Sequence, residues 1–492
     1  MTDYGHQIQR LRELGPRYSG NDAHRTLIED VASELSALGY TVERDTHSFE
    51  RWDVADGGST LTIGQKDITV SSPWPYSGET GPQGATAPLT LVTGLPKDWT
   101  AAAGKIAVID VHNLDVPSKL LFDTWSEELP FETVANPVIG SEFAGTDLTK
   151  AREAGVVGVI AVWSGLADDA ARGQYLPFTR DYQGIPALWV PESERDIVLS
   201  AAERGDTATL TLDATKTPDA SMDTLWAVSA GSGPNADEAV LVVTHSDGGN
   251  AVEENGHLGL LALARDAATT PHNRTIVFVC TAGHLRIPAV TQHGQATTAW
   301  LNAHPELWSP DTEGLTAVAG LAIEHLGAKH FGINPASGHY EPDGTLEPEI
   351  LYATTSELAE LTRATWSGVT VGSSTPLKPG ALVHLGEGEP LHDQRIPAVA
   401  LVTGPLYLLA ELEGDLVDID ALTRQIDSFR RLQTHLAGPA ESPSFGTVSL
   451  PTKEEKALAA DQVLRFVQAQ HQGRVAVVIN LRASPPCGSS NR

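Results

Sequence analysis

Cysteine is nearly absent from this sequence, which has only Cys280 and Cys487 among 492 residues. Two cysteines form neither a disulfide framework nor a zinc finger, so the fold depends on a packed core. No run of about 18 apolar residues occurs, which argues against a membrane-spanning helix. The opening segment MTDYGHQIQRLRELGPRYSG is polar and lacks the apolar centre of a signal peptide, so we expect a cytoplasmic protein.

Basic residues are also scarce, because 33 Lys and Arg stand against 63 Asp and Glu, for a formal net charge of -30. Nucleic acids and anionic membranes are bound by clusters of Lys and Arg, so neither is expected as a partner. We see no glycine-rich phosphate loop and no internal repeat. A small molecule or a short peptide is the expected substrate, and the sequence leaves homo-oligomerisation open.

The length and the local patterns predict several units, since about 100–200 residues form one ordinary domain. Helical spacing predicts helices at 5–16 and 22–39, and strand-like alternation follows to residue 72, with ADGGST as a hairpin turn. The polar stretch TKTPDASMD at 215–223 predicts a boundary. The predicted units are the N-terminal part of the main domain, an insert, the rest of the main domain, and a C-terminal helix and tail, at 1–80, 81–220, 221–440 and 441–492.

Four nearly continuous apolar runs indicate the core of the main domain, at 238–245, 274–281, 316–325 and 396–404. Such runs are typical of strands buried on both faces of a largely parallel sheet. Residues 256–267 predict a helix between the first two strands. The main domain is therefore expected to be a mainly parallel, doubly wound α/β sheet.

Ionisable side chains follow the ends of these runs. His245 and Asp247 end the first, in THSDGGNAVEENGH, and His284 follows the second. Glu324 and His325 end the third. Ligands of doubly wound sheets bind at the carboxyl ends of the strands, and zinc takes neutral imidazoles and carboxylates as ligands. The pattern therefore indicates a metal site at this edge of the sheet.

The order of these elements resembles the co-catalytic zinc aminopeptidases, the aminopeptidase Y-like family with a protease-associated insert. The resemblance covers most of residues 1–438: LRELGPRYSGNDAHRTLIEDVASELSALGYTVE is similar to the start of that family, and 85–215 resembles its β-rich protease-associated insert. The family pattern is His-x-Asp, Asp-Asn-Gly, a Glu-Glu pair, an Asp and a late His. The resemblance implies a zinc-aminopeptidase fold, with 221–440 as the metallopeptidase-like catalytic domain.

Only part of the family pattern is retained. THSD implies that His245 is a ligand and that Asp247 orients it, and EENG places Glu254 at the position of the bridging Asp. IEHLG places Glu324 at a ligand Asp. In FVCTAGHL the Glu-Glu pair is replaced, so His284 takes the general-base position and the next ligand position is a leucine. The late His has no clear counterpart, and the nearest candidates are Tyr407 and Glu411.

These matches imply one divalent metal ion, zinc by the family resemblance, held by His245, Glu254 and Glu324; manganese and iron stay open. His284 is then a fourth ligand or a proton-transfer base, and Glu253 is an alternative base. The implied activity is metal-dependent hydrolysis of an amide or related carbonyl in a small molecule or short peptide.

Other interpretations of the same residues stay open. Glu253 and Glu254 are also typical of the first turn of a helix, where acidic side chains favour the helix dipole. A binding or scaffold protein on a peptidase fold would explain the lost ligands. A non-hydrolytic cyclase or lyase would use one metal with a histidine base.

Overall fold

A sheet of 15 strands runs through the described part of the computed structural model, which comprises residues 3–94, 96–125, 129, 131–143, 147–178, 180–285, 295–368, 375–438 and 444–471. The strands of the described residues are β1 (Val42–Ile63), β2 (Lys66–Ile68), β3 (Ser72–Pro73), β4 (Ala85–Leu91), β5 (Ile106–His112), β6 (Asp115–Pro117), β7 (Asp123–Thr124), β8 (Thr133–Ala135), β9 (Gly158–Ser164), β10 (Ala187–Val190), β11 (Thr207–Ser229), β12 (Glu238–His245), β13 (Thr275–Thr281), β14 (Thr316–Ile323), β15 (Lys329–Ile333), β16 (Tyr340–Leu346), β17 (Ile350–Ala353), β18 (Leu377–Lys378) and β19 (Ala398–Val402). Two separate two-stranded sheets are formed by β6 with β8 and by β15 with β16. The α-helices are α1 (Tyr4–Leu14), α2 (Asp22–Ala37), α3 (Pro137–Phe143), α4 (Thr149–Glu153), α5 (Asp168–Ala171), α6 (Arg195–Arg204), α7 (Gly256–Thr269), α9 (Ala296–Ala303), α10 (Ser356–Thr365), α11 (Gly388–Asp393), α12 (Ile419–Ala437) and α13 (Lys453–His471).

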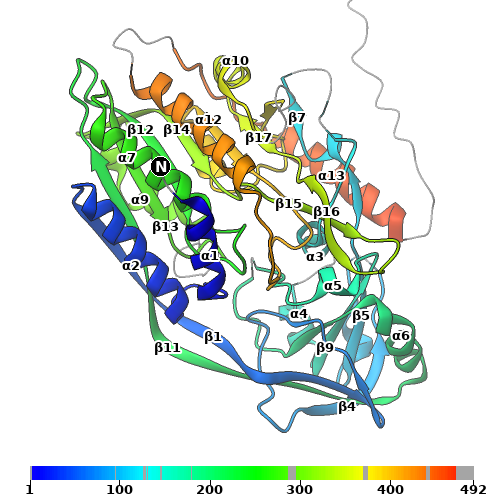
Figure 1. The fold of residues 1–492 in the computed structure, drawn as a ribbon. Coiled ribbons are helices and arrows are strands. Elements are labelled where there is room, and N and C mark those ends of the chain that lie inside the picture. The colour runs from blue at the N-terminus through cyan, green and yellow to red at the C-terminus, as the bar shows by residue number, and fades with distance from the viewer. Residues whose placement is uncertain are drawn as a thin grey trace, which may run out of the picture.

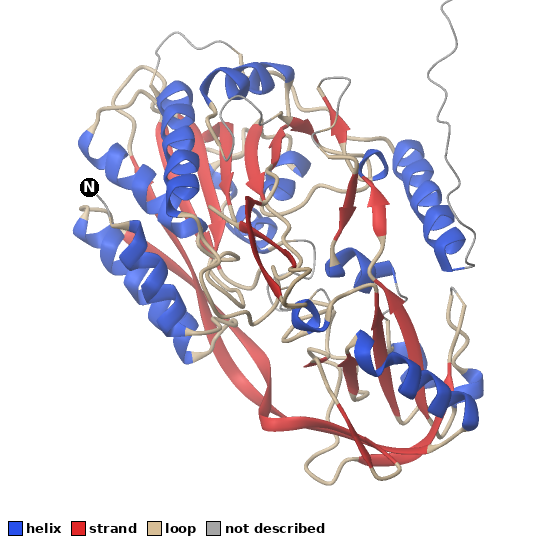
Figure 2. Cartoon of the chain, turned by 45° about the vertical axis from the view of Figure 1, so that its right-hand side comes forward, coloured by secondary structure: helices blue, strands red, loops and turns tan. Residues whose placement is uncertain are grey.

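The main lobe is built on the parallel strands β13, β12, β14 and β19, in this spatial order. Alternate residues of β12 enter two different cores. Val240 and Val242 pack with α7 and α12, whereas Leu241 and Val243 pack in the core that α9 and α11 cover. Helices therefore lie on both faces of the sheet (Figure 2). This arrangement confirms the predicted parallel α/β centre and explains why its strands are apolar throughout.

A second lobe, which we call the insert lobe, contains the parallel strands β4, β5, β9 and β10 with α4, α5 and α6 (lower right in Figure 1). Strands and helices alternate along the chain in this lobe. That this lobe is a protease-associated domain stays a prediction.

The long antiparallel strands β1 and β11 join the two lobes (Figure 1). The predicted hairpin turn ADGGST is wrong, because β1 continues through it and its register with β11 shifts between Val54 and Ser59. The polar stretch 215–223, for which the sequence predicts a boundary, lies in the middle of β11. Cross-strand pairing along most of the two long strands overrides the local turn signals.

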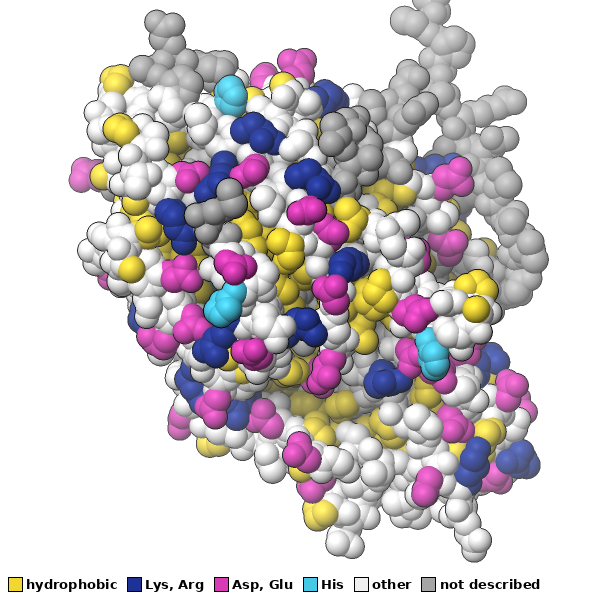
Figure 3. Space-filling view, in the orientation of Figure 1, with side chains coloured by type: hydrophobic (Ala, Val, Ile, Leu, Met, Phe, Trp, Pro, Cys, Tyr) yellow, Lys and Arg dark blue, Asp and Glu magenta, His cyan; other side chains and the backbone are white. Residues whose placement is uncertain are grey.

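The N-terminal helices α1 and α2 cover the main lobe beside α12 and α7, and α13 lies at the far side (Figure 1). The predicted tail after α13 lies outside the described residues. Among the helices that are described, none is both long and apolar enough to cross a membrane. Acidic side chains are spread over both lobes on the face in Figure 3, as the net charge predicts.

Candidate metal centre

Three buried ligand atoms come together at the carboxyl edge of β12 and β14. They belong to His245, the last residue of β12, and to Glu324 and His325, which directly follow β14. One ligand atom from each side chain lies within 4.8 Å of the other two. Within the described parts of the chain, no other group of three or more His, Cys, Asp or Glu side chains could hold a metal ion.

Backbone carbonyl groups orient both histidines of this group. The Nδ1 of His245 lies 3.1 Å from the carbonyl oxygen of Asp247, and the Nδ1 of His325 lies 2.8 Å from that of Thr403. A proton on each Nδ1 leaves each Nε2 with a free lone pair, and neither Nε2 has a hydrogen-bond partner. Burial lowers the pKa of His245 to about 3 and that of His325 well below its usual value. Both rings are therefore neutral, which is the form that binds metals.

Glu324 offers one free oxygen to the same space. Its Oε1 accepts a hydrogen bond of 2.7 Å from the backbone N–H of Glu387, whereas its Oε2 has no partner and lies 3.6 Å from the Nε2 of His245. Burial raises the pKa of Glu324 to about 8. Gly386 permits this approach, because its φ is 76° and a Cβ at this position would clash with Oε1 of Glu324.

The backbone of His325 is held in an unusual conformation. Its φ is 52°, in the left-handed region that a β-carbon disfavours. Thr403 holds it in place, because the hydroxyl of Thr403 donates to the carbonyl of His325 at 3.0 Å. Backbone strain of this kind concentrates at functional sites. The Nε2 of His245, the Oε2 of Glu324 and the Nε2 of His325 are therefore three free ligand atoms. Their number and their chemistry suit one divalent cation.

His284 stacks on His245 and pairs with a carboxylate. The two ring centroids are 3.9 Å apart, and the Nδ1 of His284 lies 2.8 Å from the Oε1 of Glu387. Burial alone would lower the pKa of His284, but the hydrogen bond and charge of Glu387 outweigh it and raise that pKa to about 9. His284 is therefore charged near neutral pH. The ligand or base role that the sequence predicts for His284 stays a prediction.

The carboxylates of Asp247 and Glu253 both accept hydrogen bonds from backbone N–H groups near the metal centre. The carboxylate of Asp247 accepts the backbone N–H groups of His284 and Leu285, each at 3.0 Å, and so fixes the turn after β13, whereas the backbone oxygen of Asp247 lies 3.1 Å from the Nδ1 of His245. Glu253 accepts the N–H of Gly249 at 2.9 Å, and burial raises its pKa well above the usual value. The catalytic roles predicted for both residues stay predictions.

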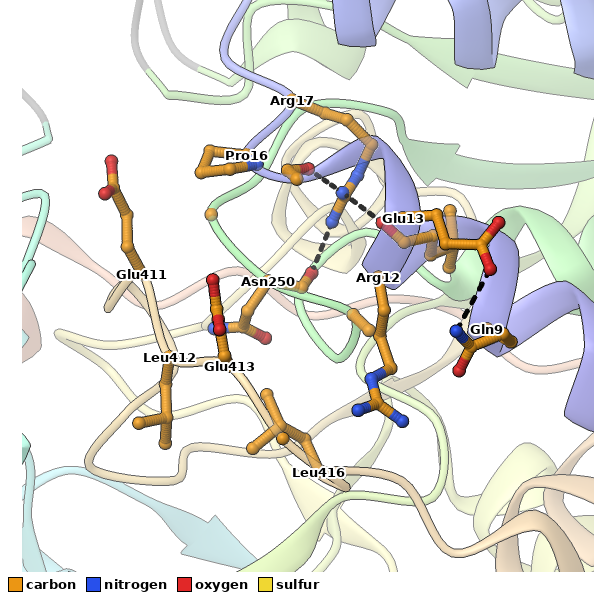
Figure 4. A pocket seen from close by; sticks show the side chains of 15 residues that line it. Gln9, Arg12, Glu13, Pro16, Arg17, Asn250, Glu411, Leu412, Glu413 and Leu416 are labelled. Carbon is orange, nitrogen blue, oxygen red and sulfur yellow. Dashed lines mark hydrogen bonds between the residues drawn. The ribbon is translucent and has the colours of Figure 1, made fainter.

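Glu254, the third predicted ligand, is paired with Arg17. The Nε of Arg17 lies 2.8 Å from the Oε1 of Glu254, and both side chains are at most 1% exposed. Arg17 also donates to the carbonyls of Leu11 and Asn250, at 2.7 and 2.9 Å (Figure 4). The guanidinium neutralises the carboxylate that the family pattern assigns to the metal. The structure thus groups His325, and not Glu254, with His245 and Glu324.

The two residues considered for the late His lie away from this group. The hydroxyl of Tyr407 donates to the carbonyl of Lys329 at 2.7 Å, and Glu411 accepts the hydroxyl of Tyr18 at 2.8 Å. Glu411 lines a cavity of about 350 Å³, which α1 and residues 411–416 enclose from opposite sides (Figure 4). The sequence analysis missed Arg17 and the carbonyl of Thr403, and no local pattern could have indicated either.

The fold of this chain is similar to that of several solved structures. The peptidase M28 precursor from Shewanella amazonensis SB2B matches with a TM-score of 0.62 and 16% identity, over 91% of this chain and 94% of that chain. The aminopeptidase from Aneurinibacillus sp. strain AM-1 matches with a TM-score of 0.59 and 16% identity, over 92% and 98%. BSAP, a zinc aminopeptidase from Bacillus subtilis, matches with 0.59 and 15%, over 90% and 97%. No protein-family model and no curated protein sequence matches the chain.

Identities this low show the fold alone. The chain has the fold of the M28 peptidases and zinc aminopeptidases, which confirms the fold that the sequence resemblance implies. Activity does not follow from the fold, because one fold hosts many functions. The argument for function therefore rests on the metal centre.

Proposed function

We propose that this protein is a metal-dependent hydrolase that acts on an amide or related carbonyl group in a small molecule or short peptide. One divalent ion, zinc by analogy with the similar structures, would be held by His245, Glu324 and His325. Such an ion polarises a carbonyl group or activates a water molecule. The single observation that carries the proposal is that three buried donor atoms face one another and lack hydrogen-bond partners.

Two side chains near the ion would transfer the protons that hydrolysis requires. His284, charged through its pair with Glu387, would donate a proton or a hydrogen bond to the leaving group. Glu253, whose pKa burial raises, would be the base that takes a proton from water. Carbonyl groups, and not carboxylates, orient both histidine ligands, so their rings stay neutral.

The test is to purify the protein, measure bound metal by mass spectrometry, and assay a panel of aminoacyl amides. We expect about one zinc per chain and turnover that a chelator removes and zinc restores. His245→Ala is expected to lose both, because two donors hold a catalytic zinc poorly. Protein that takes up no metal and turns over no amide would refute the proposal.

A non-hydrolytic cyclase or lyase is the second candidate, because Leu285 stands where the family has a carboxylate ligand and a cationic histidine stands where it has the base. Product masses separate the two chemistries, since hydrolysis adds the mass of one water to the substrate and cyclisation does not.

A further inference from the structure

A cavity beside the N-terminal helix α1 lies apart from the metal centre. It has a volume of about 350 Å³, which is in the range of small-molecule sites, and it lies between α1 and the segment 411–416 (Figure 4). Among the described residues that line it, none belongs to the metal group of His245, Glu324 and His325. A molecule bound in this cavity would therefore not be held by the metal centre.

Buried and tightly bonded residues form the floor of this cavity. The lining residues that are at most 4% exposed include Leu11, Arg17, Asn250, Ala251 and Leu416. The side-chain amide of Asn250 donates hydrogen bonds of 2.9–3.0 Å to three carbonyl groups, those of Tyr407, Leu408 and Ala410. The guanidinium of Arg17 in turn donates to the carbonyl of Asn250 at 2.9 Å. The two walls are thus fixed before a ligand arrives, which lowers the entropic cost of binding.

Unpaired side chains of opposite charge lie on the two walls. Arg12 comes from α1, whereas Glu411 and Glu413 come from the opposite wall (Figure 4). The guanidinium of Arg12 and the carboxylate of Glu413 have no hydrogen bond or ion pair with any described residue. Glu411 accepts the hydroxyl of Tyr18, a neutral group, at 2.8 Å, so its charge is not balanced. The carboxylate of Glu13 turns toward the amide of Gln9 and away from this wall (Figure 4).

Apolar side chains lie between these charges. Leu412 separates the two glutamates in the sequence, and Leu416 and Pro16 line the cavity with it. An alkyl chain that covers these side chains gains free energy by leaving water. The cavity therefore suits a molecule with an apolar stem and charged ends.

We propose that this cavity is a binding site for a free amino acid with a cationic side chain, such as lysine. The carboxylate of the ligand would pair with Arg12, and its two ammonium groups would pair with Glu411 and Glu413. One anionic and two cationic groups of the ligand match one guanidinium and two carboxylates of the cavity. A neutral amino acid would leave one carboxylate unpaired, and a diamine would leave Arg12 unpaired, so both should bind less tightly.

The test measures binding of lysine, norleucine and 1,5-diaminopentane to the full chain by calorimetry. Norleucine lacks the side-chain ammonium group of lysine, and 1,5-diaminopentane lacks its carboxylate. We expect lysine to bind about fivefold more tightly than either, because one ion pair near solvent contributes modestly. Equal affinities for the three ligands, or no saturable binding of lysine, would overturn the inference.

Two variants assign the charges of the cavity. Arg12→Met is expected to weaken the binding of lysine about fivefold and not to weaken that of 1,5-diaminopentane, because only lysine has a carboxylate. Glu413→Gln is expected to weaken both ligands by the same factor, since both carry two ammonium groups. If Arg12→Met weakens both ligands equally, its effect is structural and the inference fails.

Arg10→Met is the matched control on the same helix. Arg10 pairs with Asp30 and is not among the residues that line the cavity, so this variant should keep the wild-type affinities. The inference is independent of the proposed function. Lysine binding as described in a protein without amide turnover would support it and reject hydrolysis, whereas turnover without lysine binding would overturn it and leave the proposed function in place.

Discussion

A His325→Ala variant is expected to bind zinc at least about 100-fold more weakly than the wild type, in competition with a chelator of known affinity. The loss follows from the arrangement of donors. The Nε2 of His325 lies within 4.8 Å of the ligand atoms of His245 and Glu324 and has no hydrogen-bond partner. Removing it leaves two protein donors, too few for a structural or a catalytic zinc site.

His257→Ala is the matched control, because His257 is also buried and also faces a backbone carbonyl with its Nδ1, yet lies outside the metal group. Its zinc affinity should stay within about threefold of the wild type. Glu254→Gln decides between two ligand sets, since the family pattern assigns Glu254 to the metal whereas the structure pairs it with Arg17. Zinc lost in Glu254→Gln but retained in His325→Ala would restore the ligand set predicted from the sequence.

The strands that carry the metal centre were predictable because their apolar runs reflect burial on both faces. The predicted strand 238–245 coincides with β12, and His245 and Glu324 meet because β12 and β14 are parallel neighbours. The contribution of His325 was not predictable. It depends on a positive φ and on the carbonyl of Thr403, which lies 78 residues further along the chain.

Local signals failed where distant pairing decides the structure. ADGGST has the composition of a hairpin turn, but β1, which is 22 residues long, pairs with β11 on both sides of it and absorbs it as an irregularity of register. The partner of Glu387 was equally hidden. The fold places the carboxylate of Glu387 against the ring of His284, which is 103 residues away in the sequence.

Arg17→Met is expected to lower the free energy of unfolding by about 3–5 kcal/mol, measured by chemical denaturation. Arg17 and Glu254 are both buried, so the variant leaves a carboxylate without its counter-ion. It also leaves the carbonyls of Leu11 and Asn250 without their donor. A buried charge that loses its partner costs far more than an exposed one, because water cannot replace the partner.

Two comparisons isolate this cost. Arg10→Met breaks the pair with Asp30, in which both side chains are 47% exposed, and should change stability by no more than about 1 kcal/mol. The double variant Arg17→Met/Glu254→Met removes both charges and is expected to recover at least half of the loss, since an apolar pair of similar volume can replace a buried ion pair. If the double variant is no more stable than Arg17→Met, then the backbone contacts of Arg17, and not its charge, hold the loop that leads from β12 to α7.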